Sequence, residues 1–218
     1  MELIKKSWRD VTINSYFDLV NRLKDDSLSL YDIQAIKVAF VTGKQEDEVW
    51  NMNLAEFNQA ITDAQWLEKF DINPNVKFNK LKLADNDYVV DTNLQNFTVA
   101  QYIDFQTFYP QRKANDKVLG NIIACFIIPK GKKYGEGYDV QQLVTTINEE
   151  LDIMTANEIM FFFLKQYLIS IRATANYFNW TMKRMKKRVK DKEKMEQLEQ
   201  SWEQMKKATL VGLRSWIE

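Results

Sequence analysis

Apolar side chains recur at intervals of three and four residues over much of the chain, which is the spacing of one helical face. In residues 14–24 they are Tyr16, Leu19, Val20 and Leu23, and residues 31–41 carry a similar apolar set. Gly43 follows the second segment and is suited to end it, because glycine adopts the left-handed conformation easily. The pattern therefore predicts two helices, and a short third helix over residues 46–50.

Four later segments open with the polar signature of a helix N-terminus. In this capping box a short polar side chain bonds the backbone N–H three residues on, and a Glu or Gln there bonds back. The four pairs are Asn53 with Glu56, Thr98 with Gln101, Asp139 with Gln142, and Thr155 with Glu158. We expect helices that run from 53 to about 70, from 98 to before Pro110, from 139, and from 155 to about 189. At 1.5 Å per residue the last helix would be roughly 50 Å long.

A different pattern over residues 76–91 interrupts the helical spacing. Apolar and polar residues alternate there on both sides of a polar turn at Asp85-Asn86-Asp87, which predicts a β-hairpin. A hairpin alone is marginal in water, so it should pack on the helices or pair with another chain. Residues 118–128 form a largely apolar run, and residues 116–128 are expected to form a buried helix that Pro129 ends. Residues 130–138 hold three glycines and are expected to be a loop.

The predicted fold is mainly α, a helical bundle with one small β-hairpin (about 76–91) and a long C-terminal helical arm. We divide the chain into a helical domain with the hairpin, 1–154, and the arm, 155–218, which carries a basic junction. Near its end the arm shows a heptad-like seam. The seam consists of Met195, Leu198, Trp202, Met205, Thr209, Gly212 and Trp216. Trp202, Met205 and Trp216 could form a stripe that binds a partner.

Composition excludes several classes of chemistry. The chain has 218 residues, no His and a single Cys. Without His there is no Ser-His-Asp triad, no Cys-His pair and no ordinary zinc site. One Cys allows no disulfide within the chain. The longest apolar runs, 118–128 and 159–171, are too short or too interrupted for a membrane span, which needs about 20 residues. The early charges do not fit a signal peptide, so we expect a soluble protein that is not secreted.

No motif identifies an enzyme, and we expect no catalytic residue, no cofactor and no metal. Glu149, Glu150 and Asp152 cluster in sequence but lack an ordered metal-ligand spacing, and are better read as dipole partners or solvated charges. The glycine loop lacks the Gly-Lys-Ser/Thr ending of a phosphate-binding loop. Cys125 lies in an apolar run with no activating base, so it is expected to be a small core residue.

The most visible charge feature is a basic stretch at residues 183–194. It holds eight Lys or Arg and two acids, a net charge of 8 − 2 = +6, in a chain of zero net charge. It could contact phosphates or an acidic partner, or form a solvated helical junction. The nearby aromatics Tyr177, Phe178 and Trp180 are expected to belong to the core. Our interface candidates are Lys183, Arg184, Lys186, Lys187, Arg188, Lys190, Trp202, Met205, Trp216, Lys132 and Tyr134.

Two acidic stretches oppose the basic one. Residues 44–71 carry seven acids and two bases, and residues 139–158 carry five acids and no base. An acidic face and a basic helix could join copies of the chain head to tail. Pairing within the chain is the alternative.

Parts of the sequence resemble a known kind of protein. The segments are ACFIIPKGKKY at 124–134, GYDV at 137–140, FFFLK at 161–165, SIRAT at 170–174, TVAQYIDF at 98–105, and Thr42-Gly43-Lys44 within 30–56. Over about residues 10–185 the chain resembles small morphogenesis proteins of tailed phages, with its nearest kin among phages of Bacteroides-type gut bacteria. In siphophages the pattern looks like a tail assembly chaperone; in crAss-like podophages the resemblance implies a virion component or an ejected cargo protein.

The resemblance implies a non-enzymatic virion or assembly protein, tail- or portal-associated, that acts through multimeric helix packing, including as cargo ejected with the genome. One alternative is a tail assembly chaperone absent from the mature particle. The basic extension after Met185 departs from the short chaperone pattern. The other alternative is a nucleic-acid-binding protein that uses the basic helix 183–194. Expected partners are phage structural proteins, copies of the chain and nucleic acid, but no membrane, in the virion or the host cytoplasm during assembly.

Overall fold

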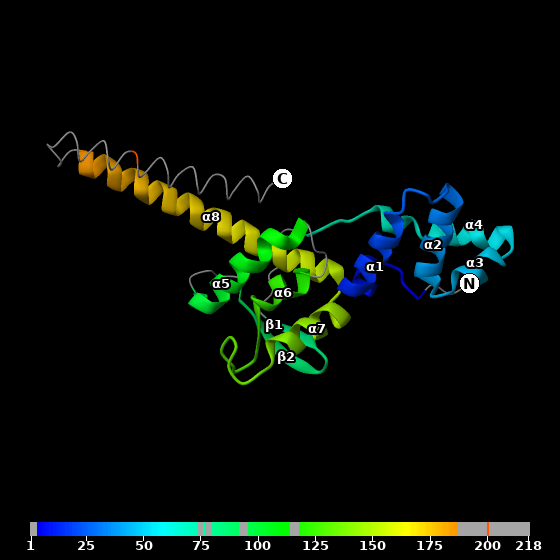
Figure 1. The fold of residues 1–218 in the computed structure, drawn as a ribbon, viewed down its shortest axis with the longest axis horizontal. Coiled ribbons are helices and arrows are strands. Elements are labelled where there is room, and N and C mark those ends of the chain that lie inside the picture. The colour runs from blue at the N-terminus through cyan, green and yellow to red at the C-terminus, as the bar shows by residue number, and fades with distance from the viewer. Residues whose placement is uncertain are drawn as a thin grey trace. The chain divides into compact units, whose positions relative to one another are not determined.

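A computed structural model describes residues 4–73, 76, 80–91, 96–113, 118–186 and 200. The described chain is mainly helical and contains a small antiparallel sheet of three strands, which confirms the predicted fold class (Figure 1). It divides into two compact units, Met1–Phe163 and Leu164–Glu218. The longest helix, α8 (Ile153–Lys186), begins in the first unit and continues into the second. The boundary predicted at residue 154 falls at the start of this helix.

Four helices form the N-terminal part of the first unit: α1 (Ile13–Leu23), α2 (Leu30–Thr42), α3 (Glu46–Trp50) and α4 (Leu54–Asp63). The first three confirm their predictions, and α2 ends at Gly43, whose φ is +69°. The helix predicted from 53 to about 70 ends at Asp63, and a 3-10 turn, Gln65–Glu68, follows it. A small apolar cluster joins α2, α3 and α4; it consists of Ala35, Val38, Ala39, Val49 and Ala60.

Only some of the four predicted capping boxes form. Thr98 and Gln101 form the full reciprocal box at the start of α5 (Val99–Phe108). Asn53 and Asp139 cap α4 and α7 (Val140–Glu150) through their side chains. The prediction for Thr155 is wrong: α8 begins two residues earlier, and the Asp152 carboxylate accepts the Thr155 backbone N–H at 2.8 Å. The polar groups of Thr155 and of Glu158, which lies one turn further along α8, are therefore left for other partners.

The predicted hairpin is confirmed, with its turn displaced. Strand β1 (Lys80–Leu83) pairs with β2 (Asn86–Val90), and Leu83 stands opposite Asn86. The turn is therefore Ala84-Asp85, with φ of +46° and +59°, and not the predicted Asp85-Asn86-Asp87. A two-residue loop with both φ positive suits the right-handed twist of a hairpin. The Glu150 carboxylate at the end of α7 accepts the Ala84 N–H at 2.5 Å and holds the turn.

The buried helix predicted over 116–128 is wrong in its second half. Helix α6 (Val118–Ala124) ends early, and β3 (Ile127–Pro129) then pairs with β2 in the order β1-β2-β3. Two β-branched isoleucines favour a strand, and β2 offers them an open edge. Pro129 fits because β3 is itself an edge strand, where a missing N–H breaks no ladder bond. The hairpin thus finds its partner strand within its own chain.

An aromatic cluster forms the centre of the first unit. Phe105 comes from α5, Phe126 from the turn after α6, and Phe163 from α8, and all three are fully buried. The ring centroids of Phe126 and Phe163 are 4.3 Å apart, and those of Phe105 and Phe163 are 4.8 Å apart. Rings of this size dominate core energetics, so this cluster fixes α5 and α6 against the first turns of α8.

Candidate functional site

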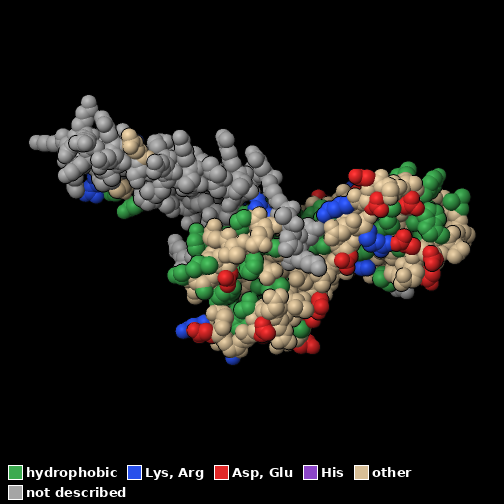
Figure 2. Space-filling model, in the orientation of Figure 1, with side chains coloured by type: hydrophobic (Ala, Val, Ile, Leu, Met, Phe, Trp, Pro, Cys, Tyr) green, Lys and Arg blue, Asp and Glu red, His purple; other side chains and the backbone are tan. Residues whose placement is uncertain are grey.

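Helix α5 has an apolar face that the first unit does not cover. Val99, Tyr102 and Ile103 are 76%, 45% and 55% exposed, and the spacing of three and four places them on one side of the helix. Figure 2 shows hydrophobic side chains gathered over α5. We refer to these three residues as the α5 apolar face. A surface helix normally turns polar residues outward, so a helix apolar on both sides indicates a second contact.

The opposite side of α5 is anchored firmly. Gln101 is buried and its side-chain amide donates to the Cys125 carbonyl at 3.1 Å. Phe105 lies in the aromatic cluster. Because these anchors and the Thr98 cap fix the helix, the apolar face is held in place in the free chain.

The glycine loop is tied to the same helix. The Tyr134 hydroxyl donates to the Asp104 carboxylate on α5 at 2.8 Å, and the Gly135 N–H donates to the Tyr138 hydroxyl at 3.3 Å. Burial raises the pKa of the Tyr134 phenol, so it stays a hydrogen-bond donor at any ordinary pH. The loop prediction is confirmed, and Tyr134, an interface candidate, serves as its anchor. Lys132, the second candidate in the loop, is exposed.

Cys125 lies beneath this loop and is fully buried. Burial raises the pKa of its thiol to about 12, because desolvation disfavours the thiolate. A thiol that stays protonated at neutral pH is a poor nucleophile, so the predicted core role of Cys125 is confirmed.

The second half of α8 carries an exposed line of aromatic and basic side chains. Exposed residues with helical spacing in this half include Ala173, Asn176, Tyr177, Trp180, Lys183 and Arg184. We call these six residues the α8 stripe. Tyr177 and Trp180 are 62% and 53% exposed, so the expectation that they belong to the core is wrong for both. The Arg184 guanidinium lies 5.2 Å from the centroid of the Trp180 ring.

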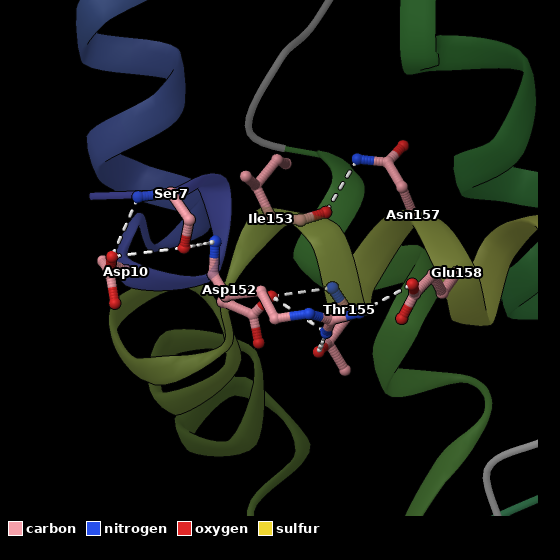
Figure 3. A network of polar contacts seen from close by, with 8 residues as sticks. Ser7, Asp10, Asp152, Ile153, Thr155, Asn157 and Glu158 are labelled. Carbon is pink, nitrogen blue, oxygen red and sulfur yellow. Dashed lines mark hydrogen bonds and ion pairs between the residues drawn. The ribbon is translucent and has the colours of Figure 1, made fainter. Parts of the chain in front are cut away.

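A polar network joins the N-terminal segment to the start of α8 (Figure 3). The chain at Val11–Ile13 pairs with Leu151–Ile153: the Ile13 N–H donates to the Leu151 carbonyl at 3.1 Å, and the Ile153 N–H donates to the Val11 carbonyl at 2.8 Å. Nearby, Arg9 donates to the Glu158 carboxylate at 2.7 Å and to the Thr155 hydroxyl at 3.2 Å. These contacts hold together two segments that lie about 140 residues apart in the sequence.

Glu158 is the unusual member of this network, because only 2% of it is exposed. Its Oε1 is paired with Arg9, whereas its buried Oε2 has no hydrogen-bond partner among the described residues. A buried carboxylate needs its counter-ion, so Arg9 is required to keep Glu158 buried. The sequence showed Glu158 only as a capping residue and gave no signal for Arg9, because their contact is distant along the chain.

Two further acidic residues near this point serve as hydrogen-bond acceptors for the backbone. Glu150 holds the hairpin turn and Asp152 caps α8. In the described ranges no group of three or more His, Cys, Asp or Glu side chains is arranged to hold a metal ion. Within the same ranges no helix combines the length and the apolar character needed to cross a bilayer.

The structure describes only some of the predicted interface residues. Lys183 and Arg184 lie together on the α8 stripe, while Lys132 and Tyr134 lie in the glycine loop of the first unit. The described part of helix α8 extends to Lys186. The other candidates, Lys187, Arg188, Lys190, Trp202, Met205 and Trp216, lie outside the described residues, as does the heptad-like seam. Sequence reasoning missed the α5 apolar face, although Val99, Tyr102 and Ile103 lie directly behind the Thr98 cap.

The fold and these surfaces define a mainly helical protein with an apolar face on α5 and an aromatic, basic line on α8. Comparisons with family models, with curated proteins and with solved structures find no match to the chain.

Proposed function

We propose that the chain is a non-enzymatic virion or assembly protein of a tailed bacteriophage, tail- or portal-associated, that acts by packing helices against other structural proteins and copies of itself. The resemblance of residues 10–185 to tailed-phage morphogenesis proteins supports the phage part of this proposal. The α5 apolar face supports the assembly part, and it is the observation that carries the proposal.

The α5 apolar face is held rigidly and is exposed to solvent. Burial of apolar area contributes about 25 cal/mol per Å², so three large exposed side chains represent a sizeable gain on docking. The buried anchors Gln101 and Phe105 hold the helix, so little conformational entropy is lost when a partner binds. In an assembly protein such a face becomes an interface core, and the charged residues around it set register.

The first experiment is mass spectrometry of gradient-purified particles of the phage that encodes the chain, with the copy number per particle. We expect the protein in fixed, multiple copies. Its presence in infected cells but absence from particles would replace the virion role by the tail assembly chaperone role. Absence from both particles and assembly intermediates would overturn the proposal.

A second experiment addresses the α5 apolar face itself. Particles are produced with Ile103→Glu in the chain, because one buried carboxylate in an apolar interface is costly. We expect incorporation to fall at least about tenfold. Gln141→Glu is the matched control, since it changes charge by the same amount at an exposed position of α7. Equal incorporation of both variants would show that this face is not the interface.

A further inference from the structure

We propose that the α8 stripe binds single-stranded nucleic acid, with Tyr177 and Trp180 stacking on bases and Lys183 and Arg184 contacting phosphates. This contact is a function separate from the packing role of α5, and it does not depend on it.

The α8 stripe places two aromatic rings beside two cationic side chains. Tyr177, Trp180 and Arg184 follow one another at intervals of three and four residues, so they share one side of α8. The rings of Tyr177 and Trp180 have centroids 6.3 Å apart, and Lys183 is exposed beside them. Stacking on aromatic rings is tolerant of sequence, because every base has a flat π-face. Bases must be unpaired to stack in this way, and the ligand is therefore single-stranded.

The α8 stripe also carries positive charge at its C-terminal end, at Lys183 and Arg184. The Arg184 guanidinium lies over one face of the Trp180 ring, so a nucleotide stacked on the opposite face of that indole has a cation within reach of its phosphate. Beyond Lys183 and Arg184 the sequence adds six more bases and two acids up to residue 194. This excess of positive charge follows the aromatic positions along the chain, which is the combination that single-strand binding uses.

The alternative ligand is the acidic surface of a second copy of the chain. Several of its carboxylates are already paired within their own chain. In the first acidic stretch, Glu46 pairs with Arg22 and Glu68 pairs with Lys37. In the second, Asp152 and Glu158 are engaged at the start of α8, and Glu150 holds the hairpin turn. These five carboxylates already have partners within the chain, which reduces the acidic surface available to a second copy and favours phosphates as the ligand of the stripe.

The test is fluorescence anisotropy of the full chain with a labelled oligothymidine of about 20 nucleotides, at about 50 and 200 mM salt. We expect binding that weakens steeply with salt. Lys183→Gln with Arg184→Gln removes two phosphate contacts, so the ratio of affinities between the two salt concentrations should fall about sevenfold. Trp180→Ala should weaken binding at least about fivefold at both concentrations and leave the salt dependence unchanged. Trp180→Phe should restore most of the loss.

The matched control is Lys130→Gln with Lys133→Gln, which removes the same charge from the exposed glycine loop and should leave binding unchanged. The proposal is overturned if the full chain does not bind the oligonucleotide at low salt. It is also overturned if the loop variant and the stripe variant lose affinity equally. If the stripe variants instead alter only the molecular mass measured by light scattering, the stripe joins copies of the chain and the proposal fails. Circular dichroism at 222 nm checks that each variant keeps its helices.

Discussion

At the scale of single residues, the hairpin turn contains a conformational misfit. Ala84 has φ of +46°, in the left-handed region that costs a residue with a Cβ about 1–2 kcal/mol. Its neighbour Asp85 is also left-handed, but aspartate tolerates this region better. The chain keeps Ala84 there because the Glu150 carboxylate accepts its N–H and the two strands on either side are paired.

Replacing Ala84 with glycine should therefore stabilise the protein. Relief of the left-handed strain exceeds the added flexibility of the unfolded chain, so we expect Ala84→Gly to raise the free energy of unfolding by about 0.5–1 kcal/mol. Urea denaturation measures the change. Ala55→Gly, at an exposed position in α4, is the control and should lower stability, because its backbone is helical. Equal losses in both variants would contradict the strain at Ala84.

At the scale of elements, Arg9 joins the N-terminal segment to α8. Arg9→Ala should lower the free energy of unfolding by about 2–3 kcal/mol, less than for a fully buried pair because Arg9 is half exposed. The loss arises because the Glu158 carboxylate stays buried without its guanidinium. Glu158→Gln in the Arg9→Ala background should recover about 1 kcal/mol or more, which a double-mutant cycle by urea denaturation measures.

The control for this cycle is Arg22, which pairs with Glu46 between two half-exposed side chains. Surface pairs of this kind contribute about 0–1 kcal/mol, so Arg22→Ala should have little effect. Additive losses for Arg9 and Glu158 would mean that the two side chains act independently.

Prediction from sequence succeeded where the signal was local. Gly43 ended α2 and the Thr98 box opened α5, because a cap needs only residues within one turn. It failed where a distant partner decided the outcome. Ile127 lies in a strand because the edge of β2 is available for pairing. The Thr155 and Glu158 side chains contact Arg9 because Asp152 caps α8 in their place. Exposure of Val99 and Trp180 likewise depends on what packs around each helix.

At the scale of the whole molecule, the first unit includes the first turns of α8 as part of its packed core. Phe163, its last residue, fills the aromatic cluster with Phe105 and Phe126. Glu158 meets Arg9, and Ile153 pairs with Val11. These contacts join the N-terminal segment at Arg9 and Val11, helix α5 and the turn after α6 to one short part of α8.

A fragment of residues 1–163 should consequently fold on its own, with a cooperative thermal transition and near-ultraviolet circular dichroism from its packed aromatics. The matched fragment 1–152 lacks both Phe163 and Glu158, and loss of the buried phenylalanine alone costs about 3–5 kcal/mol, comparable to the whole stability of many domains. We expect that fragment to lose the cooperative transition. The fragment 1–163 should also fail to bind the oligonucleotide, because the α8 stripe begins after its last residue. Cooperative unfolding of both fragments would show that the start of α8 is dispensable, and oligonucleotide binding by 1–163 would place the nucleic-acid contact in the first unit instead.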